Sequence, residues 1–362
     1  MEILLILGAL VISFALVMLT IPPIVTIAKA KKLFDPFDER KIHTSIVPPL
    51  GGVAIFIAFV LSTIIATDGL SFDSLKYIIA AVIIMFFIGL KDDILVISAR
   101  KKFMIQVFAA TLLIALGNIR FTNLHGILGI HELNYLPSIS ITLFVMIGII
   151  NAFNLIDGID GLASGLATIS SISFGIWFYL TGNYQLSIMS FALVGSLIGF
   201  FIYNVFGHRN KLFMGDTGSL IIGIVMSTLV IKFNELNLTA DSYALSSAPA
   251  FSLAIVSIPI IDTLRVFSLR ISKRKSPFAP DKNHLHHRLL SIMPNNHFKV
   301  TCTITAVNII LIGIGLLFNY TYWNTNIQFL LILIIGFLFS FFPSLVLASE
   351  KQKKVLKTAK AS

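Results

Sequence analysis

The sequence predicts an all-α, polytopic integral membrane protein with about 10–11 transmembrane helices, its N-terminus outside and its C-terminus cytoplasmic. Of the 362 residues, 56% are hydrophobic and only 12% are charged. The apolar residues form runs of roughly 20, which is the helical length that crosses a bilayer, and they lack the alternation of a membrane barrel. Helices are required because hydrocarbon offers no hydrogen-bond partner to the backbone. We expect one transmembrane domain at 1–349 and a basic tail at 350–362.

Eleven apolar runs between polar breaks are candidate spans. The first runs on to Pro22-Pro23 without a basic segment before it, so we interpret it as a retained span and not a cleaved signal peptide. The runs at 103–117 and 137–153 are short or marginal, which leaves the number of spans open by one or two. The spans are expected near 3–28, 50–67, 75–90, 103–117, 137–153, 159–180, 184–203, 213–231, 246–268, 301–318 and 327–348.

Basic residues fix the expected orientation. All Lys and Arg residues except Lys76, Arg120 and Lys232 fall in the tail or in loops that follow odd-numbered spans. The positive-inside rule makes those loops cytoplasmic. Orientation and anionic lipid explain the net charge of +10, so we expect the lipid bilayer and no nucleic acid as a partner. The cytoplasmic loops that carry the chemistry are expected at 29–49, 91–102, 151–160, 204–219 and 265–299.

Aspartates lie at this cytoplasmic edge after two of the apolar runs and at the start of a third. Asp92-Asp93 closes one run, where the alternative is a solvated helix end in which Lys91 pairs locally. Asp157 and Asp160 are three residues apart within 151–163, a segment with no Lys or Arg. They therefore need metal, water or substrate donors, unless the segment is an ordinary turn-rich loop.

Two further segments have chemistry suited to phosphate. Phe213-Met-Gly-Asp-Thr-Gly-Ser219 opens an apolar run, where backbone N–H groups suit phosphate and Asp216 suits a divalent ion; the alternative is a plain helix cap. His284, His286 and His287 lie in a strongly basic loop after Pro280-Asp281-Lys282. Phosphate binding fits them better than zinc, and a solvated polar loop is the alternative.

Jointly these segments favour Mg²⁺, with Mn²⁺ as an alternative, because the ligands are hard oxygens and magnesium is usually held by one or two protein groups plus phosphates. The single cysteine, Cys302, excludes an intrachain disulfide and a multi-cysteine metal site. A fifth segment, Asp38 to His43 followed by Val47 to Gly52, adds basic residues at the cytoplasmic edge of the membrane. Basic residues in that position usually only determine topology. Together, these segments predict phosphoryl transfer at a membrane surface.

The segments also occur in the order of a known family. Pro49 to Gly52, Lys91 to Asp93, 151–163, Tyr203-Asn204, Phe213 to Ser219 and His284 to His287 together resemble the polyprenyl-phosphate N-acetylhexosamine-1-phosphate transferases. The run His-Leu-His-His-Arg resembles the GlcNAc-1-phosphate branch, whereas the muramoyl-pentapeptide branch has three consecutive histidines followed closely by an acid. The stretch from Asn204 to Phe213 is slightly longer than in that second branch.

The resemblance implies transfer of GlcNAc-1-phosphate from UDP-GlcNAc to undecaprenyl phosphate, with release of UMP, at the cytoplasmic face of the inner membrane. This would be the first membrane step of an O-antigen, enterobacterial-type or teichoic acid polymer. Another UDP-HexNAc or UDP-MurNAc-pentapeptide is the alternative donor, and a homodimer is one arrangement open to such a protein. An ion-coupled transporter is the alternative class, but its acids would lie near the midplane, often within internal repeats.

The resemblance also implies a division of roles. Asp216 and Asn154 would hold the metal, and Lys102 would lie near the phosphates. Asp92 and Asp93 would position the lipid phosphate, which is already mostly dianionic at pH 7 and needs little proton removal. The uridine would contact Phe213, Asp157, Asn151, Asp160 and Asn204. The sugar-phosphate side would contact Arg265, His284, His286 and His287.

Overall fold

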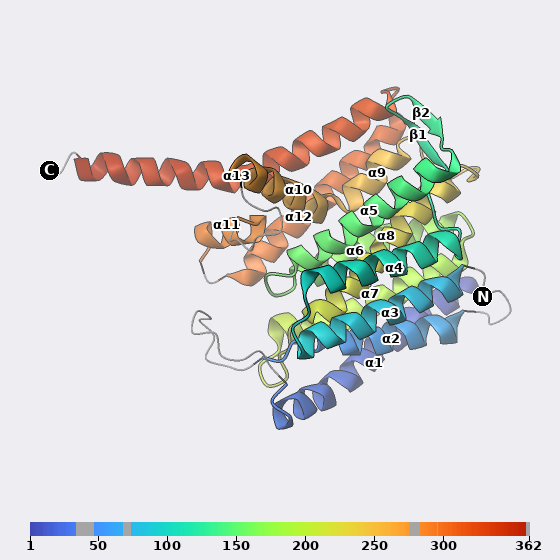
Figure 1. Ribbon diagram of the computed structural model, residues 1–362, viewed down its shortest axis with the longest axis horizontal. Helices are drawn as coiled ribbons and strands as arrows, with labels where there is room; N and C mark the ends of the chain where they lie inside the picture. The colour runs from blue at the N-terminus through green and yellow to red at the C-terminus, as the bar shows by residue number, and fades with distance from the viewer. Residues whose placement is uncertain (34–46, 68–73, 275–282, 295, 360–362) are drawn as a thin grey trace.

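The computed structural model is a bundle of long helices packed side by side (Figure 1). It describes residues 1–33, 47–67, 74–274, 283–294 and 296–359, and side chains only as far as 349. Residues 38–43 and 280–282, which the sequence places in two of the basic loops, lie outside the described part. The elements are α1 (Glu2–Ala30), α2 (Gly51–Ala66), α3 (Leu75–Ile94), α4 (Ala99–Ala115), β1 (Asn123–Ile127), β2 (Ile130–Glu132), α5 (Tyr135–Ile156), α6 (Leu162–Leu180), α7 (Tyr184–Phe206), α8 (Gly215–Asn237), α9 (Ala248–Ile255), α10 (Ser257–Ser272), α11 (Leu285–Ile292), α12 (His297–Leu317), the 3-10 helix η1 (Phe318–Tyr320) and α13 (Thr325–Ala359).

A helix occupies each of the eleven expected spans, and the protein is an all-α, multi-pass membrane protein. By length and composition, seven helices in the described residues can cross a membrane, or eight if α9 and α10 are one bent span. The shortfall from eleven has a physical cause. Helices α2 and α4 have only 16 and 17 residues, and α3 ends in three charged residues, Lys91, Asp92 and Asp93.

The expected ninth span is broken into α9 and α10, which meet at an angle of 77°. A break frees backbone carbonyls that need partners where water is absent. Ser170 donates its hydroxyl to the carbonyl of Ile255 at 3.0 Å, and the Asn308 amide donates to the carbonyl of Ala254 at 2.9 Å. Side chains of α6 and α12 therefore stabilise the bend, which directs α10 along a different course from α9.

Helix α8 lies at the centre of the bundle. It packs against α2, α3, α5 and α6, and nearly all its side chains are buried. Its approach to α5 is close, because a Cβ atom on Gly223 would lie 2.6 Å from the Cα of Ile150. Neighbouring helices therefore hold the first turn of α8, Gly215 to Ser219, in a fixed place.

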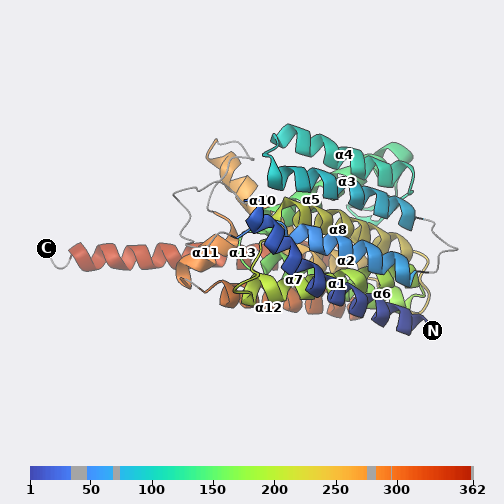
Figure 2. The same cartoon turned by 90° about the horizontal axis from the view of Figure 1, so that it is seen from below.

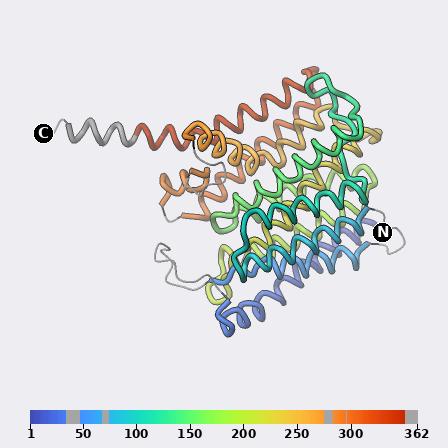
Figure 3. Tube along the Cα trace, in the orientation of Figure 1, coloured from blue at the N-terminus to red at the C-terminus, as the bar shows by residue number. Residues whose placement is uncertain are grey.

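The two ends of the bundle differ (Figures 2 and 3). The N-terminus and the hairpin β1–β2 lie at one end, and α11 lies at the other, where α13 projects beyond the bundle (Figure 1). Chain direction places the ends of α3, α5, α7 and α10 and the start of α8 at the α11 end. The aspartate segments and the histidine segment are thus at the same end, as expected from the sequence.

Candidate active site

Asp93 caps the first turn of α8. One of its carboxylate oxygens accepts a hydrogen bond from the Asp216 amide at 2.7 Å. The other accepts from the amide of Thr217 at 3.0 Å and from its hydroxyl at 2.5 Å. These bonds satisfy amides that a helix start leaves without intrahelical partners. Asp93 therefore holds the Asp216 segment in place, and its expected contact with a lipid phosphate stays a prediction.

Lys102 links the other two carboxylates of this cluster. Its ammonium lies 3.1 Å from an oxygen of Asp92 and 2.8 Å from an oxygen of Asp216. The second oxygen of Asp92 accepts the Ile97 amide at 2.8 Å, which fixes the short turn between α3 and α4. Two carboxylates share one cation here, and burial together with the nearby Asp216 raises the pKa of Asp92. A further cation would therefore stabilise the ionised pair.

Asn154 reaches the same carboxylate from α5. Its side-chain nitrogen donates to Asp216 and, at 2.8 Å, to the hydroxyl of Ser219. In the described part of the chain, no three His, Cys, Asp or Glu side chains are arranged to hold a metal. The Asn154 nitrogen faces Asp216 here, so the amide would have to turn to offer its oxygen to a cation. Asp216 with that oxygen would suit magnesium, which commonly takes one or two protein ligands and completes its shell with phosphates and water.

Three glycines permit the close packing that assembles this cluster. A Cβ atom on Gly52 of α2 would lie 2.2 Å from the Gly218 nitrogen, and one on Gly89 of α3 would lie 2.4 Å from the Cα of Thr217. Gly215 adopts a φ of +72°, a conformation that other residues rarely adopt. The segment before α2 also pairs with this region, since the amide of Gly51 donates to the carbonyl of Phe213 at 2.9 Å. The Pro49 to Gly52 segment is therefore a structural support for the site.

The loop between α5 and α6 brings Asp157 and Asp160 to the same end. Asp157 follows the last residue of α5 and is partly exposed. Desolvation, followed by repulsion from Asp216, Asp93 and Asp160, raises the pKa of Asp157 to about 7. An added cation or a hydrogen-bond donor from a ligand would relieve this cost.

Asp160 is paired with two basic residues. Its carboxylate lies 2.6 Å from the Lys211 ammonium and 3.4 Å from Nδ1 of His297. Burial opposes its ionisation, but hydrogen bonds and attraction from His297 and Lys211 outweigh burial, and the pKa of Asp160 is lowered. Asp160 thus ties its loop to the α7–α8 connection and to the start of α12.

Two other residues that were predicted to contact the nucleotide, Asn204 and Asn151, form hydrogen bonds within the protein. The Asn204 side chain accepts the Gly161 amide at 2.7 Å and donates to the Leu212 carbonyl at 2.9 Å. Asn151 donates to the side-chain oxygen of Gln106 at 2.9 Å. Phe213 is half-buried beside the cluster. Contacts of these three residues with a uridine stay predictions.

A second cluster joins α10 to α11. Arg265 is fully buried and donates to Asp262 at 2.8 Å and to the Asn283 carbonyl at 2.6 Å. His284 is also buried and places Nδ1 2.8 Å from the other oxygen of Asp262. The expected association of Arg265 with the histidine segment is therefore present, and Asp262 creates it. Asp262 was missed in the sequence because it lies inside an apolar run; its i, i+3 spacing to Arg265 was the available signal.

His286 connects this second cluster to the Asp157 loop. A Cβ atom on Gly158 would lie 2.1 Å from Nε2 of His286, so only glycine leaves room for the ring. The ring of His287 is 4.3 Å from that of His286, centroid to centroid. All four predicted sugar-phosphate residues therefore come from the α10–α11 region, and the Asp157 loop lies beside them.

Acid should destabilise the fold through His286. Burial, with repulsion from His287, lowers the pKa of His286 to about 3, whereas an unfolded histidine titrates near 6.5. Between these values the unfolded chain binds a proton that the folded chain does not, so this group lowers stability by about 1.4 kcal/mol for each unit that the pH is lowered. The raised pKa of Asp157 acts in the opposite direction in both proteins, so the comparison between them isolates His286. From pH 7.5 to 5.5 we expect the unfolding temperature of detergent-purified His286→Gln to fall less, or rise more, than that of the wild type. An identical change in both proteins would contradict this assignment.

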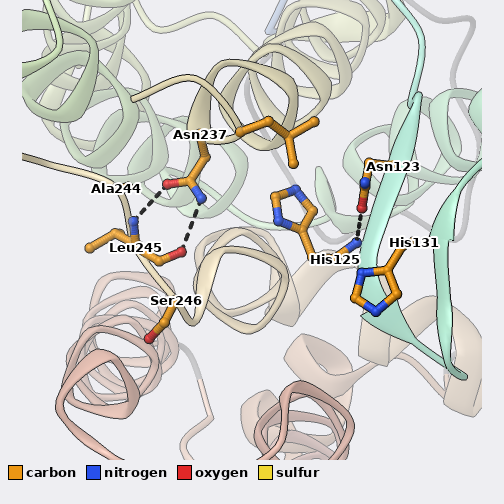
Figure 4. A pocket seen from close by; sticks show the side chains of 8 residues that line it. Asn123, His125, His131, Asn237, Ala244, Leu245 and Ser246 are labelled. Carbon is orange, nitrogen blue, oxygen red and sulfur yellow. Dashed lines mark hydrogen bonds between the residues drawn. The ribbon is translucent and has the colours of Figure 1, made fainter. Parts of the chain in front are cut away.

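A cavity of about 500 Å³ lies at the opposite end of the bundle (Figure 4). Its amides serve the fold: Asn237 accepts from the Leu245 amide at 2.7 Å and donates to its carbonyl at 3.0 Å, and Asn123 accepts the His125 amide. The residues that line it carry no carboxylate. This cavity is therefore separate from the aspartate clusters.

Fold and site together define a multi-pass membrane protein with aspartates, a lysine and a histidine–arginine cluster at one end of a helix bundle. The glycosyl transferase family 4 model matches residues 75–234, from α3 to most of α8. The chain is 30% identical over 316 residues to an undecaprenyl-phosphate alpha-N-acetylglucosaminyl 1-phosphate transferase of Escherichia coli O157:H7, covering 86% of this chain and 83% of that one. It is 31% identical over 293 residues to a probable undecaprenyl-phosphate N-acetylglucosaminyl 1-phosphate transferase of Bacillus subtilis, covering 81% and 79%. The protein belongs to glycosyl transferase family 4.

Proposed function

We propose that this protein transfers GlcNAc-1-phosphate from UDP-GlcNAc to undecaprenyl phosphate and releases UMP. The observation that carries the proposal is the Lys102 bridge between Asp92 and Asp216 at the capped start of α8. This arrangement gathers carboxylates and a cation where a diphosphate and a metal ion can meet. The names of the two relatives support the same substrates. The distribution of basic residues supports an orientation in which this end faces the cytoplasm at the inner membrane, where UDP-sugars would be available.

In the proposed reaction, an oxygen of the lipid phosphate attacks the β-phosphorus of UDP-GlcNAc. A new P–O bond forms to the lipid phosphate, and the bond from the β-phosphorus to the bridging oxygen breaks. That oxygen leaves with its electron pair as part of UMP. The product is undecaprenyl-diphosphate-GlcNAc, the lipid on which a cell-surface glycopolymer is started. Such phosphoryl transfers depend mainly on positioning and on electrostatic stabilisation.

The residues have separate tasks in this scheme. Asp216 and Asn154 would hold Mg²⁺, with Mn²⁺ as a substitute. When bound, the ion neutralises charge on the diphosphate. Lys102 supplies a second positive charge within the same cluster. Asp93 keeps the α8 start in place through three hydrogen bonds. Asp92 orients the lipid phosphate, which at pH 7 is already mostly dianionic.

The nucleotide and the sugar would lie on either side of the Asp157 loop. Asp157 would accept a hydrogen bond from the uracil edge, and Phe213 would stack on the ring. Arg265 and the histidines would receive the sugar-phosphate. The contact between Gly158 and His286 supports this order, because it places the nucleotide loop directly against the histidine segment.

A donor panel tests the proposal. Purified protein with Mg²⁺ and undecaprenyl phosphate should form a butanol-extractable labelled lipid from radiolabelled UDP-GlcNAc. Product from UDP-MurNAc-pentapeptide or another UDP-HexNAc, but not from UDP-GlcNAc, would overturn the donor assignment. Ion-coupled substrate flux in proteoliposomes without any lipid product would overturn the transferase itself.

A further inference from the structure

Asp262 is a buried carboxylate that the proposed reaction does not use directly. It is 1% exposed, and both of its oxygens are engaged. One oxygen accepts from Arg265 and from the Leu285 amide, each at 2.8 Å. The other lies 2.8 Å from Nδ1 of His284. One side chain of α10 therefore fixes a guanidinium, an imidazole and the start of α11 together.

Arg265 keeps hydrogen-bond donors without protein partners. The side chain is 0% exposed, so water cannot reach it. Within the described part of the chain, its Nε and Nη1 atoms have no hydrogen-bond partner. The Phe341 ring faces the guanidinium at 5.8 Å but offers no acceptor atom. Leaving charged donors buried without acceptors is strongly unfavourable. An anionic group that enters the cluster would remove this cost.

His286 shows the same property. It is 1% exposed, and neither ring nitrogen has a hydrogen-bond partner among the described residues. Its ring stacks beside that of His284, with centroids 5.8 Å apart and planes 12° apart. Arg265, His284 and His286 thus lie close together, and Asp262 is the group that orders two of them.

We propose that Asp262 is a positioning residue for the sugar-phosphate part of the donor, acting through Arg265 and His284. The inference rests on the proposed function and deepens it. Asp262 holds Nη2 of Arg265, which leaves Nε and Nη1 for a phosphate oxygen. Its bond to His284 favours the tautomer in which Nδ1 donates, so that Nε2 accepts from a sugar hydroxyl. Asp262 itself does not touch the substrate.

The test separates the sugar-phosphate subsite from the nucleotide subsite. Initial rates of wild-type protein and Asp262→Asn are measured against UDP-GlcNAc concentration at saturating undecaprenyl phosphate and Mg²⁺. UMP, which lacks the β-phosphate and the sugar, is used as a competitive product inhibitor. We expect Asp262→Asn to raise KM for UDP-GlcNAc about tenfold or more while the inhibition constant of UMP stays within about twofold, since a hydrogen bond to a charged group contributes about 1.5–3 kcal/mol.

Two further variants make the result specific. Ser268→Ala, which removes an exposed hydroxyl on the same helix, should leave KM and the UMP inhibition constant unchanged. In an Arg265→Met background, Asp262→Asn should raise KM less than it does alone, because the two residues act together. If Asp262→Asn does not fold, Asp262→Glu keeps the charge and should show the same selective rise in KM, only smaller.

The possible results bear on the positioning role of Asp262 and on the proposed function. A parallel rise of KM and the UMP inhibition constant, or an unchanged KM in an active variant, would overturn the positioning role. Full additivity with Arg265→Met would also overturn it. Wild-type protein that forms no lipid product from any UDP-HexNAc would instead overturn the proposed function, and this inference with it.

Discussion

Replacing Asp216 by Asn should lower kcat by at least about a hundredfold, because removing one stabilising group from a preorganised site commonly costs that much. The carboxylate of Asp216 accepts from Lys102 and Asn154, and the residue lies in the first turn of the buried helix α8. The amide keeps the shape of the side chain but removes its charge and weakens its oxygen as a metal ligand. Turnover is measured by lipid product at several Mg²⁺ concentrations, and the variant should need much more Mg²⁺ or not respond to it.

Glu235→Gln is the matched control for this change. Glu235 lies in the last turn of the same helix and accepts the Thr122 amide and hydroxyl, each at 2.7 Å. It supports the hairpin at the opposite end of the bundle, so its replacement should cost some thermal stability and leave kcat nearly unchanged. Full activity of Asp216→Asn, in a protein as stable as the wild type, would contradict the proposed role of Asp216 as a metal ligand.

Gly89→Ala should disrupt both folding and activity. The added Cβ atom would lie 2.4 Å from the Cα and 2.7 Å from the nitrogen of Thr217, and these backbone atoms cannot rotate away. Helices α3 and α8 must then separate, which breaks the cap that Asp93 places on α8. Overpacking of this kind costs about 1–3 kcal/mol. We expect the unfolding temperature in detergent to fall by roughly several degrees and kcat to fall at least about tenfold.

Gly148→Ala separates this effect from a general effect of alanine in a helix. Gly148 lies in the middle of α5, and a Cβ atom built there has no neighbour within 4 Å. Alanine is the better helix former, so this variant should be as stable as the wild type or slightly more stable. Equal behaviour of Gly89→Ala and Gly148→Ala would show that the contact between α3 and α8 does not constrain the site.

Most of the helices, and the end of the bundle at which each connecting loop lies, follow from local properties of the chain. Runs of apolar residues need helical backbone in a membrane, and each run is interrupted by polar residues that must remain at an edge. This was enough to place Asp92, Asp157 and Asp216 at one end, although they are distant in sequence. The bend at Val256 could not be predicted in this way, because its partners Ser170 and Asn308 come from other helices.

The contacts among site residues were harder to predict than their common location. The alternative that a cap explains the Asp216 segment was partly correct, since α8 is capped, but the capping group is Asp93 from another helix. Asp160 was expected to need outside compensation because its segment has no basic residue, yet Lys211 supplies it from the α7–α8 connection. Long-range pairs of this kind depend on helix packing, which a single sequence does not encode locally.

The sequence also left the small elements unassigned. The hairpin β1–β2 and the short helix α11 have no long apolar run, so their signals are weak. Both are positioned by tertiary contacts. Glu235 binds the segment before the hairpin, and Asp262 binds the first amide of α11. The second of these contacts matters for function, because it brings the histidine segment to Arg265.

The fate of the β-phosphate tests the central claim most directly. Purified protein is given UDP-GlcNAc labelled with ³²P at the β-phosphorus, together with undecaprenyl phosphate and Mg²⁺, and the nucleotide and lipid products are separated. Attack at the β-phosphorus predicts that the label enters the lipid and that an equal amount of unlabelled UMP is released. Labelled UDP together with an unlabelled glycolipid would mean attack at the sugar carbon, and it would contradict the proposed transfer of GlcNAc-1-phosphate.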